Sequence, residues 1–159
     1  MLHRYLPVAS SSFKAVDKGW DAFVEMLPEL KSVSIKTGIQ ADAGVGDDGV
    51  SIAEYAAFNE FGTSNIPERS FIRATADNER RKWSAALDKM ITEVIKGNRS
   101  LDNGLGIVGQ LTEQDIKRTI RNLSEPANAQ STIDTKGSSN PLIDTGIMLN
   151  SIRYIVEHN

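Results

Sequence analysis

The strongest constraint on the fold is a long stretch, residues 71–96, that contains neither glycine nor proline. Its apolar residues recur at the spacing of one helix face, and they are Ile72, Ala76, Trp83, Leu87, Met90, Ile91 and Val94. We therefore predict one long amphipathic helix, ended by Gly97 and Asn98. Such a helix is stable only when its apolar face is covered, so the rest of the chain must supply a second layer.

The N-terminal part divides into an arm and the start of a domain. Residues 1–16 have no regular apolar period and are interpreted as an arm before a single domain, 17–159. The domain is expected to begin with a helix over 17–30, which Asp17 caps and which Pro28 distorts or ends. The predicted buried face of this helix consists of Trp20, Phe23, Val24 and Leu27.

Two segments alternate between apolar and polar residues, which is typical of strands with one buried face. They predict strands over 32–41 and 151–157, with inward residues Val33, Ile35, Thr37, Ile39, Ile152, Tyr154 and Val156. With the long helix packed across them, they define an α+β fold with a small, mostly antiparallel sheet. The acidic, glycine-rich residues 42–49 are interpreted as a loop or hairpin tip, because their spacing does not fit a calcium loop.

Shorter helices are expected at two places. Ser51 and Glu54 have the spacing of a capping box, which predicts a helix to about Phe61 with Gly62 in the left-handed conformation as its stop. The inward residues of this helix would be Ile52, Tyr55, Ala56 and Phe58. Near the C-terminus, residues 146–150 predict one turn of helix, with the Asp144 carboxylate as its N-cap.

The segment 101–123 combines helical apolar spacing with three glycines. Each of Gly104, Gly106 and Gly109 weakens a helix by roughly 1 kcal/mol relative to alanine. We therefore predict a weak first part and a firmer helix from about Thr112, ended at Glu125-Pro126. The glycines match the bare spacing of a dinucleotide-binding loop but follow no predicted strand, so no such site is expected. Residues 132–135 are expected to form a short strand.

Composition excludes several classes of protein. The chain has 159 residues, no cysteine and a net charge of −3. This length suits one domain without disulfides or thiolate metal sites, made in a reducing cytoplasm. The charge argues against a general nucleic-acid binder but leaves room for a protein through which DNA passes. No apolar run is long enough to span a membrane, and residues 1–7 do not resemble a signal peptide.

Three groups of residues are candidates for chemical sites. Residues 142–146 (LIDTG) resemble the segment in which aspartic proteases present a catalytic carboxylate. Those enzymes need two such carboxylates, and this chain has one copy of the segment, so only a symmetric homodimer could supply the second carboxylate. We therefore favour a capping role for Asp144. His3 and His158 have no second ligand at metal-binding spacing, so neither a metal nor a cofactor is expected. The basic residues are interpreted as a solvated, salt-bridged face rather than a DNA patch, and they are Arg69, Arg73, Arg80, Arg81 and Lys82.

Two segments together resemble a known family. They are residues 52–63 (IAEYAAFNEFGT), followed by 66–73 (IPERSFIR), and residues 141–152 (PLIDTGIMLNSI). In this order, separated by a long helix, they resemble the tail-completion or head–tail joining proteins of long-tailed bacteriophages. That family also includes virion morphogenesis and minor tail proteins. The resemblance covers roughly residues 33–157, and it departs from the family pattern at Ser70, where proline is usual, and at Met148.

The resemblance implies a structural protein of the virion neck or tail, without enzymatic activity. It implies a closed, hexameric homo-oligomeric ring between the head connector, or portal-side adaptor, and the tail tube, with DNA only as passing cargo. The alternatives are a tail terminator that caps the tube, a DNA-binding neck factor and the homodimeric aspartic protease. The residues that carry the motifs are expected to be structural, with Phe61 and Phe71 as core anchors, and they are Glu60, Phe61, Gly62, Thr63, Pro67, Arg69, Phe71, Asp144, Thr145, Gly146 and Ser151.

Overall fold

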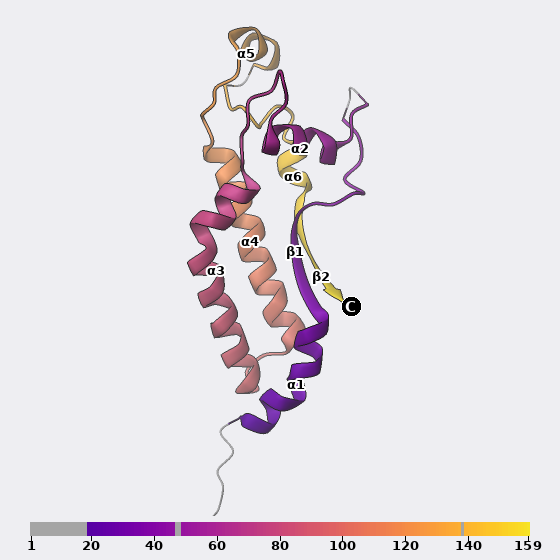
Figure 1. The fold of residues 1–159 in the computed structure, drawn as a ribbon, viewed down its shortest axis with the longest axis vertical. Coiled ribbons are helices and arrows are strands. Elements are labelled where there is room, and N and C mark those ends of the chain that lie inside the picture. The colour runs from indigo at the N-terminus through magenta and orange to yellow at the C-terminus, as the bar shows by residue number, and fades with distance from the viewer. Residues whose placement is uncertain (1–18, 47–48, 138) are drawn as a thin grey trace, which may run out of the picture.

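Two long helices and a two-stranded sheet lie side by side, roughly along the long axis of the molecule (Figure 1). The computed structural model describes residues 19–46, 49–137 and 139–159. The elements in chain order are α1 (Trp20–Ser32), β1 (Val33–Ile39), α2 (Ile52–Phe61), α3 (Ile72–Ile95), α4 (Leu101–Asn122), α5 (Gln130–Lys136), α6 (Ile147–Ser151) and β2 (Ile152–His158). The predicted α+β class is confirmed.

The sheet joins segments that are far apart in the sequence. β1 pairs with β2 antiparallel, in a register that runs from Val33 opposite His158 to Ile39 opposite Ile152. Both strands agree with the predicted alternation, because their inward residues contact the apolar core while Lys36 and Arg153 are exposed. This pairing brings the α2 and α6 regions together at one end of the molecule (Figure 1).

The long helix predicted over 71–96 is confirmed as α3, and a second helix of similar length lies antiparallel to it (Figure 1). α4 is continuous from Leu101 to Asn122, so the prediction of a weak first part and a start near Thr112 was wrong. The glycines explain this difference. A Cβ on Gly104 would lie 2.4 Å from Met90 Cγ, and one on Gly109 would lie 2.2 Å from the Tyr154 ring. These glycines therefore permit close packing of α4 against α3 and β2.

α1 buries only part of the predicted face, because Phe23 contacts the apolar core while two other predicted inward residues are exposed. Trp20 is 68% exposed and Val24 is 43% exposed, whereas Met26 is buried. Apolar spacing identifies a helix face but does not say on which side the neighbouring element lies. Pro28 lies inside α1, which continues to Ser32 rather than ending at the proline. The expected N-cap, Asp17, and the expected arm lie outside the described residues.

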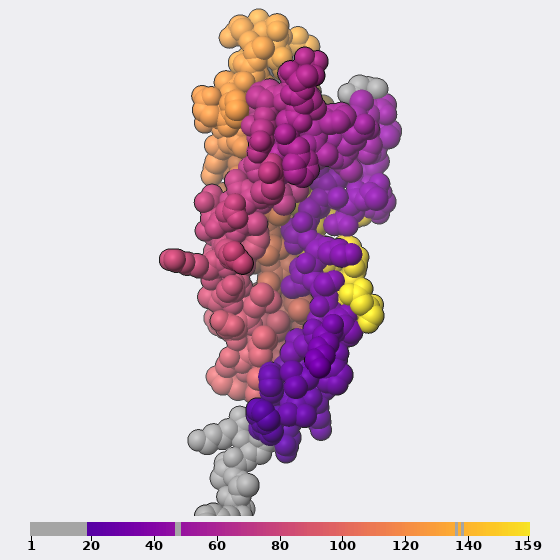
Figure 2. All heavy atoms as spheres, in the orientation of Figure 1, coloured from indigo at the N-terminus to yellow at the C-terminus, as the bar shows by residue number. Residues whose placement is uncertain are grey.

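The buried apolar side chains form two clusters along the long axis. One, near α2 and α6, contains Ile52, Ala56, Phe71, Ile116, Ile120, Leu142, Met148 and Ile152. The other, near α1, contains Met26, Met90, Leu101, Leu105 and Val108. The surface is correspondingly elongated, with α1 at one end and the α5 segment at the other (Figure 2).

Two local predictions were wrong for physical reasons. Residues 132–135 belong to helix α5, because none of the described residues forms a strand beside them and the backbone groups are satisfied locally, as when Ile133 N–H donates to Ala129 O. Ser51 precedes α2 without a side-chain capping bond, and its backbone instead forms an isolated bridge with Val45. α4 ends at Asn122, close to the end predicted from Glu125-Pro126. Among the described helices, none is long and apolar enough to cross a membrane.

Candidate functional site

Glu60 connects the end of α2 to the start of α3. Its side chain is buried, and it accepts the backbone N–H groups of Phe71 at 2.8 Å, Ile72 at 2.9 Å and Arg73 at 3.0 Å. The Ser70 hydroxyl and Arg73 Nε also donate to it, each at 3.0 Å. The first amides of a helix have no partner within the helix, so the carboxylate supplies the acceptor and also complements the helix dipole.

The protonation state of Glu60 follows from these contacts. Burial alone raises the pKa of this carboxyl, because it disfavours the charged form. The backbone hydrogen bonds from Ile72, Arg73 and Phe71, together with that from the Arg73 side chain, outweigh burial and hold the pKa below its ordinary value. The sequence does not reveal this role, because the capping contact crosses a turn rather than joining neighbouring residues.

Arg69 is buried and holds the turn between α2 and α3 against the segment after α4. Its Nε donates to Pro126 O at 2.8 Å, and its Nη2 donates to Ala127 O at 3.2 Å and Asn128 Oδ1 at 3.1 Å. Arg69 therefore does not belong to the exposed basic face that the sequence predicted.

The rest of that basic face is partly paired. Arg73 contacts Glu60 and Glu68, and Lys82 lies 2.6 Å from Asp115, as the salt-bridged interpretation predicts. Arg80 and Arg81 are exposed on α3.

The predicted anchors of the Glu-Phe-Gly-Thr segment behave differently from each other. Phe71 is completely buried, as predicted, but Phe61 is 64% exposed. The reason is that α2 turns Ile52 and Ala56 toward the core, which leaves its last residue on another side. The Arg73 guanidinium lies 4.7 Å from the centroid of the Phe61 ring, a cation–π contact.

The turn after Phe61 has the features expected of its residue types. Gly62 has a positive φ of 73°, but its ψ of 167° is extended rather than left-handed helical, so that part of the prediction was wrong. A Cβ at this position would lie 3.0 Å from Glu68 N. The Thr63 hydroxyl accepts from the backbone N–H groups of Asn65 and Ile66, and Pro67 is exposed.

The C-terminal segment is held by Asn140 rather than by Asp144. Asn140 Oδ1 accepts the N–H groups of Leu142 at 2.9 Å and Ile143 at 3.0 Å. α6 begins after Gly146, whose φ is 80°, without a side-chain capping bond, so the predicted capping role of Asp144 was wrong. Asp144 is exposed, and within the described part of the chain it forms no hydrogen bond or ion pair. The Ser151 hydroxyl donates to Ile147 O.

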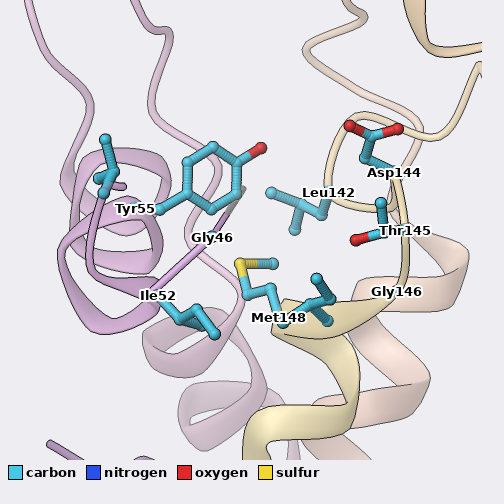
Figure 3. A pocket seen from close by; sticks show the side chains of 10 residues that line it. Gly46, Ile52, Tyr55, Leu142, Asp144, Thr145, Gly146 and Met148 are labelled. Carbon is cyan, nitrogen blue, oxygen red and sulfur yellow. The ribbon is translucent and has the colours of Figure 1, made fainter. Parts of the chain in front are cut away.

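The two motif segments, far apart in the sequence, meet around a pocket of about 240 Å³ (Figure 3). Its walls are mainly apolar, and the side chains of Tyr55 and Leu142 extend toward the space between the segments, while Asp144 and Thr145 lie along one side (Figure 3). The lining residues are Gly46, Val50, Ile52, Tyr55, Leu142, Asp144, Thr145, Gly146, Ile147 and Met148. Asp144 is the only charged residue among them, so this lining provides no pair of carboxylates.

A second group of polar side chains lies at the opposite end of the sheet. Glu29, Asp102 and His158, all exposed, place their oxygen and nitrogen atoms within 4.8 Å of one another. His158 Nε2 lies 3.4 Å from Asp102 Oδ1, as an ion pair when the imidazole is protonated. Sequence spacing did not reveal this group, because its members come from α1, α4 and β2.

Comparison of the chain with protein-family models, with curated proteins and with solved structures found no match.

Proposed function

We propose that this chain is a structural subunit of the neck or tail end of a long-tailed bacteriophage, which acts by assembling with copies of itself into a ring. The resemblance of residues 52–73 and 141–152 to tail-completion proteins motivates this proposal. The ring would join the head connector to the tail tube, and DNA would pass through it. Its place of action would be the virion, after synthesis in the host cytoplasm.

The observation that carries the proposal is the exposure of large apolar side chains at both ends of the molecule. At the α1 end, Trp20 and Val24 are exposed. At the α2–α6 end, Val45, Phe61 and Ile147 are 65%, 64% and 38% exposed. Exposed large apolar side chains mark interaction surfaces, so their presence at both ends suits a subunit that contacts other copies.

The proposal includes no chemical step. Catalysis by an aspartic protease requires two carboxylates that share a proton, and the described lining of the pocket contains Asp144 alone. The motif residues instead make structural contacts, as Glu60 does at the start of α3 and Arg69 does behind the turn. A symmetric homodimer is the one arrangement that would restore the protease hypothesis, and the mass measurement below distinguishes it from a ring.

The test is the mass of the assembled protein. Light scattering after size exclusion, over a range of concentrations, should give a closed oligomer larger than a dimer, and electron microscopy should show a central opening. Mass spectrometry should find the chain in purified phage particles. A protein that stays monomeric or dimeric at every concentration and is absent from particles contradicts the proposal.

Two further measurements separate the alternatives within phage biology. A tail terminator would bind the end of purified tail tubes in the absence of heads, whereas a joining protein would also bind the head connector. A DNA-binding neck factor would bind duplex DNA with an affinity that falls steeply as salt increases. We expect connector binding and no steep salt-dependent affinity for DNA.

A further inference from the structure

The pocket and the exposed Phe61 lie at opposite ends of one helix. Ile52 and Tyr55, at the start of α2, line the pocket, whereas Phe61 is its last residue. α2 has 10 residues, which corresponds to a length of about 15 Å. The helix therefore keeps Phe61 away from the pocket of its own chain, so the Phe61 side chain can enter such a pocket only on another copy.

The pocket has the size and chemistry of a socket for one side chain. Its volume of about 240 Å³ is below the roughly 300–1,000 Å³ that is typical of small-molecule sites. Ile52, Leu142 and Met148 give it apolar walls, and Tyr55 adds an aromatic face (Figure 3). Asp144 contributes a carboxylate at one side, and it has no partner within the described residues.

Phe61 and Arg73 have the complementary properties. The Phe61 ring is 64% exposed, and the guanidinium of Arg73 lies 4.7 Å from its centroid. Half of the Arg73 side chain remains exposed although it pairs with Glu60 and Glu68. An aromatic ring with a cation beside it matches an apolar pocket with a carboxylate at its edge, and aromatic and arginine side chains supply most interface hot spots.

We propose that Phe61 of one copy inserts into the pocket of the next copy and that Arg73 of the first copy then approaches Asp144 of the second. This contact rests on the proposed ring function and names the surface that builds it. The two surfaces differ, so the contact is head-to-tail, and repetition of a head-to-tail contact closes into a ring when its rotation permits. The occupant is a second copy of this chain, because both complementary surfaces belong to the same molecule.

Cross-linking tests the contact directly, because the chain contains no cysteine. A variant with both Phe61→Cys and Thr145→Cys, treated with a short bis-maleimide, should give a ladder of covalent multimers on a denaturing gel. A mixture of the two single variants should give only a covalent dimer, and each single variant alone should give none. The matched control carries Thr145→Cys together with Ser84→Cys, at an exposed position on α3, in place of Phe61→Cys. Its two cysteines should not cross-link to each other.

A second measurement does not depend on cross-linking. Phe61→Ser should weaken self-association about 30-fold, the effect of removing one interface hot spot, and should leave the thermal midpoint unchanged at dilutions where both proteins are monomeric. Leu87→Ser is the control, because Leu87 is an exposed apolar residue of α3 away from the pocket, and it should change association less than about twofold.

The outcomes separate this contact from the proposed function. If the wild-type protein forms rings but positions 61 and 145 do not cross-link, or if Phe61→Cys cross-links to itself, the proposed contact is wrong and the ring function stands. If the wild-type protein does not assemble and is absent from particles, both proposals fail. A ladder together with weaker association of Phe61→Ser supports the contact.

Discussion

Glu60, near the end of α2, accepts the backbone N–H of Ile72 at 2.9 Å, at the first residue of α3. One carboxylate thus holds the beginning of the longest helix from the end of the preceding one. The turn between them, residues 62–71, is fixed at both ends, and this fixes where Phe61 is presented. The Glu-Phe-Gly-Thr segment therefore stabilises the fold through its glutamate and exposes its aromatic residue.

Replacement of Glu60 should show how much this capping contact stabilises the fold. Glu60→Ala leaves three backbone N–H groups without their acceptor and should lower the free energy of unfolding by about 3 kcal/mol. Urea denaturation measures the change. Glu68→Ala, which removes the exposed partner of the same Arg73, is the control and should cost less than about 1 kcal/mol. Equal effects of the two substitutions would contradict the assigned role.

The stability of the protein should decrease in acid. For Asp115, as for Glu60, burial raises the pKa, but hydrogen bonds from Lys82 and Trp83 and the charge of Arg118 outweigh it and lower the pKa. A carboxyl whose pKa is lower in the folded state stabilises the protein above its unfolded pKa, about 4, and loses that contribution as pH falls through the lower folded value.

Urea denaturation at a series of pH values, from about 7 to about 2, measures this loss. A variant with both Glu60→Gln and Asp115→Asn should be less stable at neutral pH and should lose less stability on acidification. Two results would contradict this assignment. The wild-type protein could keep its full stability at pH values below about 4, or the variant could show the same pH dependence as the wild type; either would show that these two carboxyls do not cause the loss of stability in acid.

The glycines of α4 should respond in opposite directions to alanine. Gly109→Ala should destabilise the protein by about 1–3 kcal/mol, because its Cβ would lie 2.2 Å from the Tyr154 ring. Gly106→Ala should stabilise it by up to about 1 kcal/mol, because its Cβ would meet only the Tyr154 hydroxyl at 3.5 Å and alanine favours helix. Thermal denaturation of the two variants checks the difference in sign, and a tolerated Gly109→Ala would rule out close packing here.

Asn140 should contribute more to the stability of the fold than Asp144, although the sequence predicted Asp144 as the capping residue. Asn140→Ala removes the acceptor for two backbone N–H groups and should cost about 1–3 kcal/mol. Asp144→Asn should change stability by less than about 0.5 kcal/mol, because the exposed carboxylate does not cap α6. Chemical denaturation of both variants is the measurement. A large loss of stability in Asp144→Asn would restore its capping role.

The confirmed predictions depend on sequence patterns within a single helix or strand. The alternation in β1 and β2 follows from the two-residue repeat of a strand, so the prediction that Thr37 and Tyr154 face inward is confirmed by their contacts with α4. The apolar stripe of α3 was likewise predicted from its own spacing. Phe71 was identified as a buried anchor because it begins that stripe.

The predictions that failed depend on neighbours that the local sequence does not reveal. Trp20 and Met26 both belong to the apolar part of α1, and only the position of α3 decides which of them is buried. Glu60 was treated as part of a helix end, whereas its function depends on amides that follow the next turn. The pocket was not predicted, because its two sides are about 90 residues apart in the sequence and meet only in the fold.

The pairing of β1 with β2 has a consequence for synthesis. Every helix from α2 to α6 lies between these two strands in the chain, so the ribosome makes all of them before β1 can find its partner. Until then the apolar inward face of β1 lacks half of its sheet, and an unpaired strand of this kind is prone to join other chains. The helical hairpin of α3 and α4 depends on contacts between segments close in the sequence, and its synthesis is complete before that of β2. We therefore expect Ile35 of β1 to pack against this hairpin while translation continues.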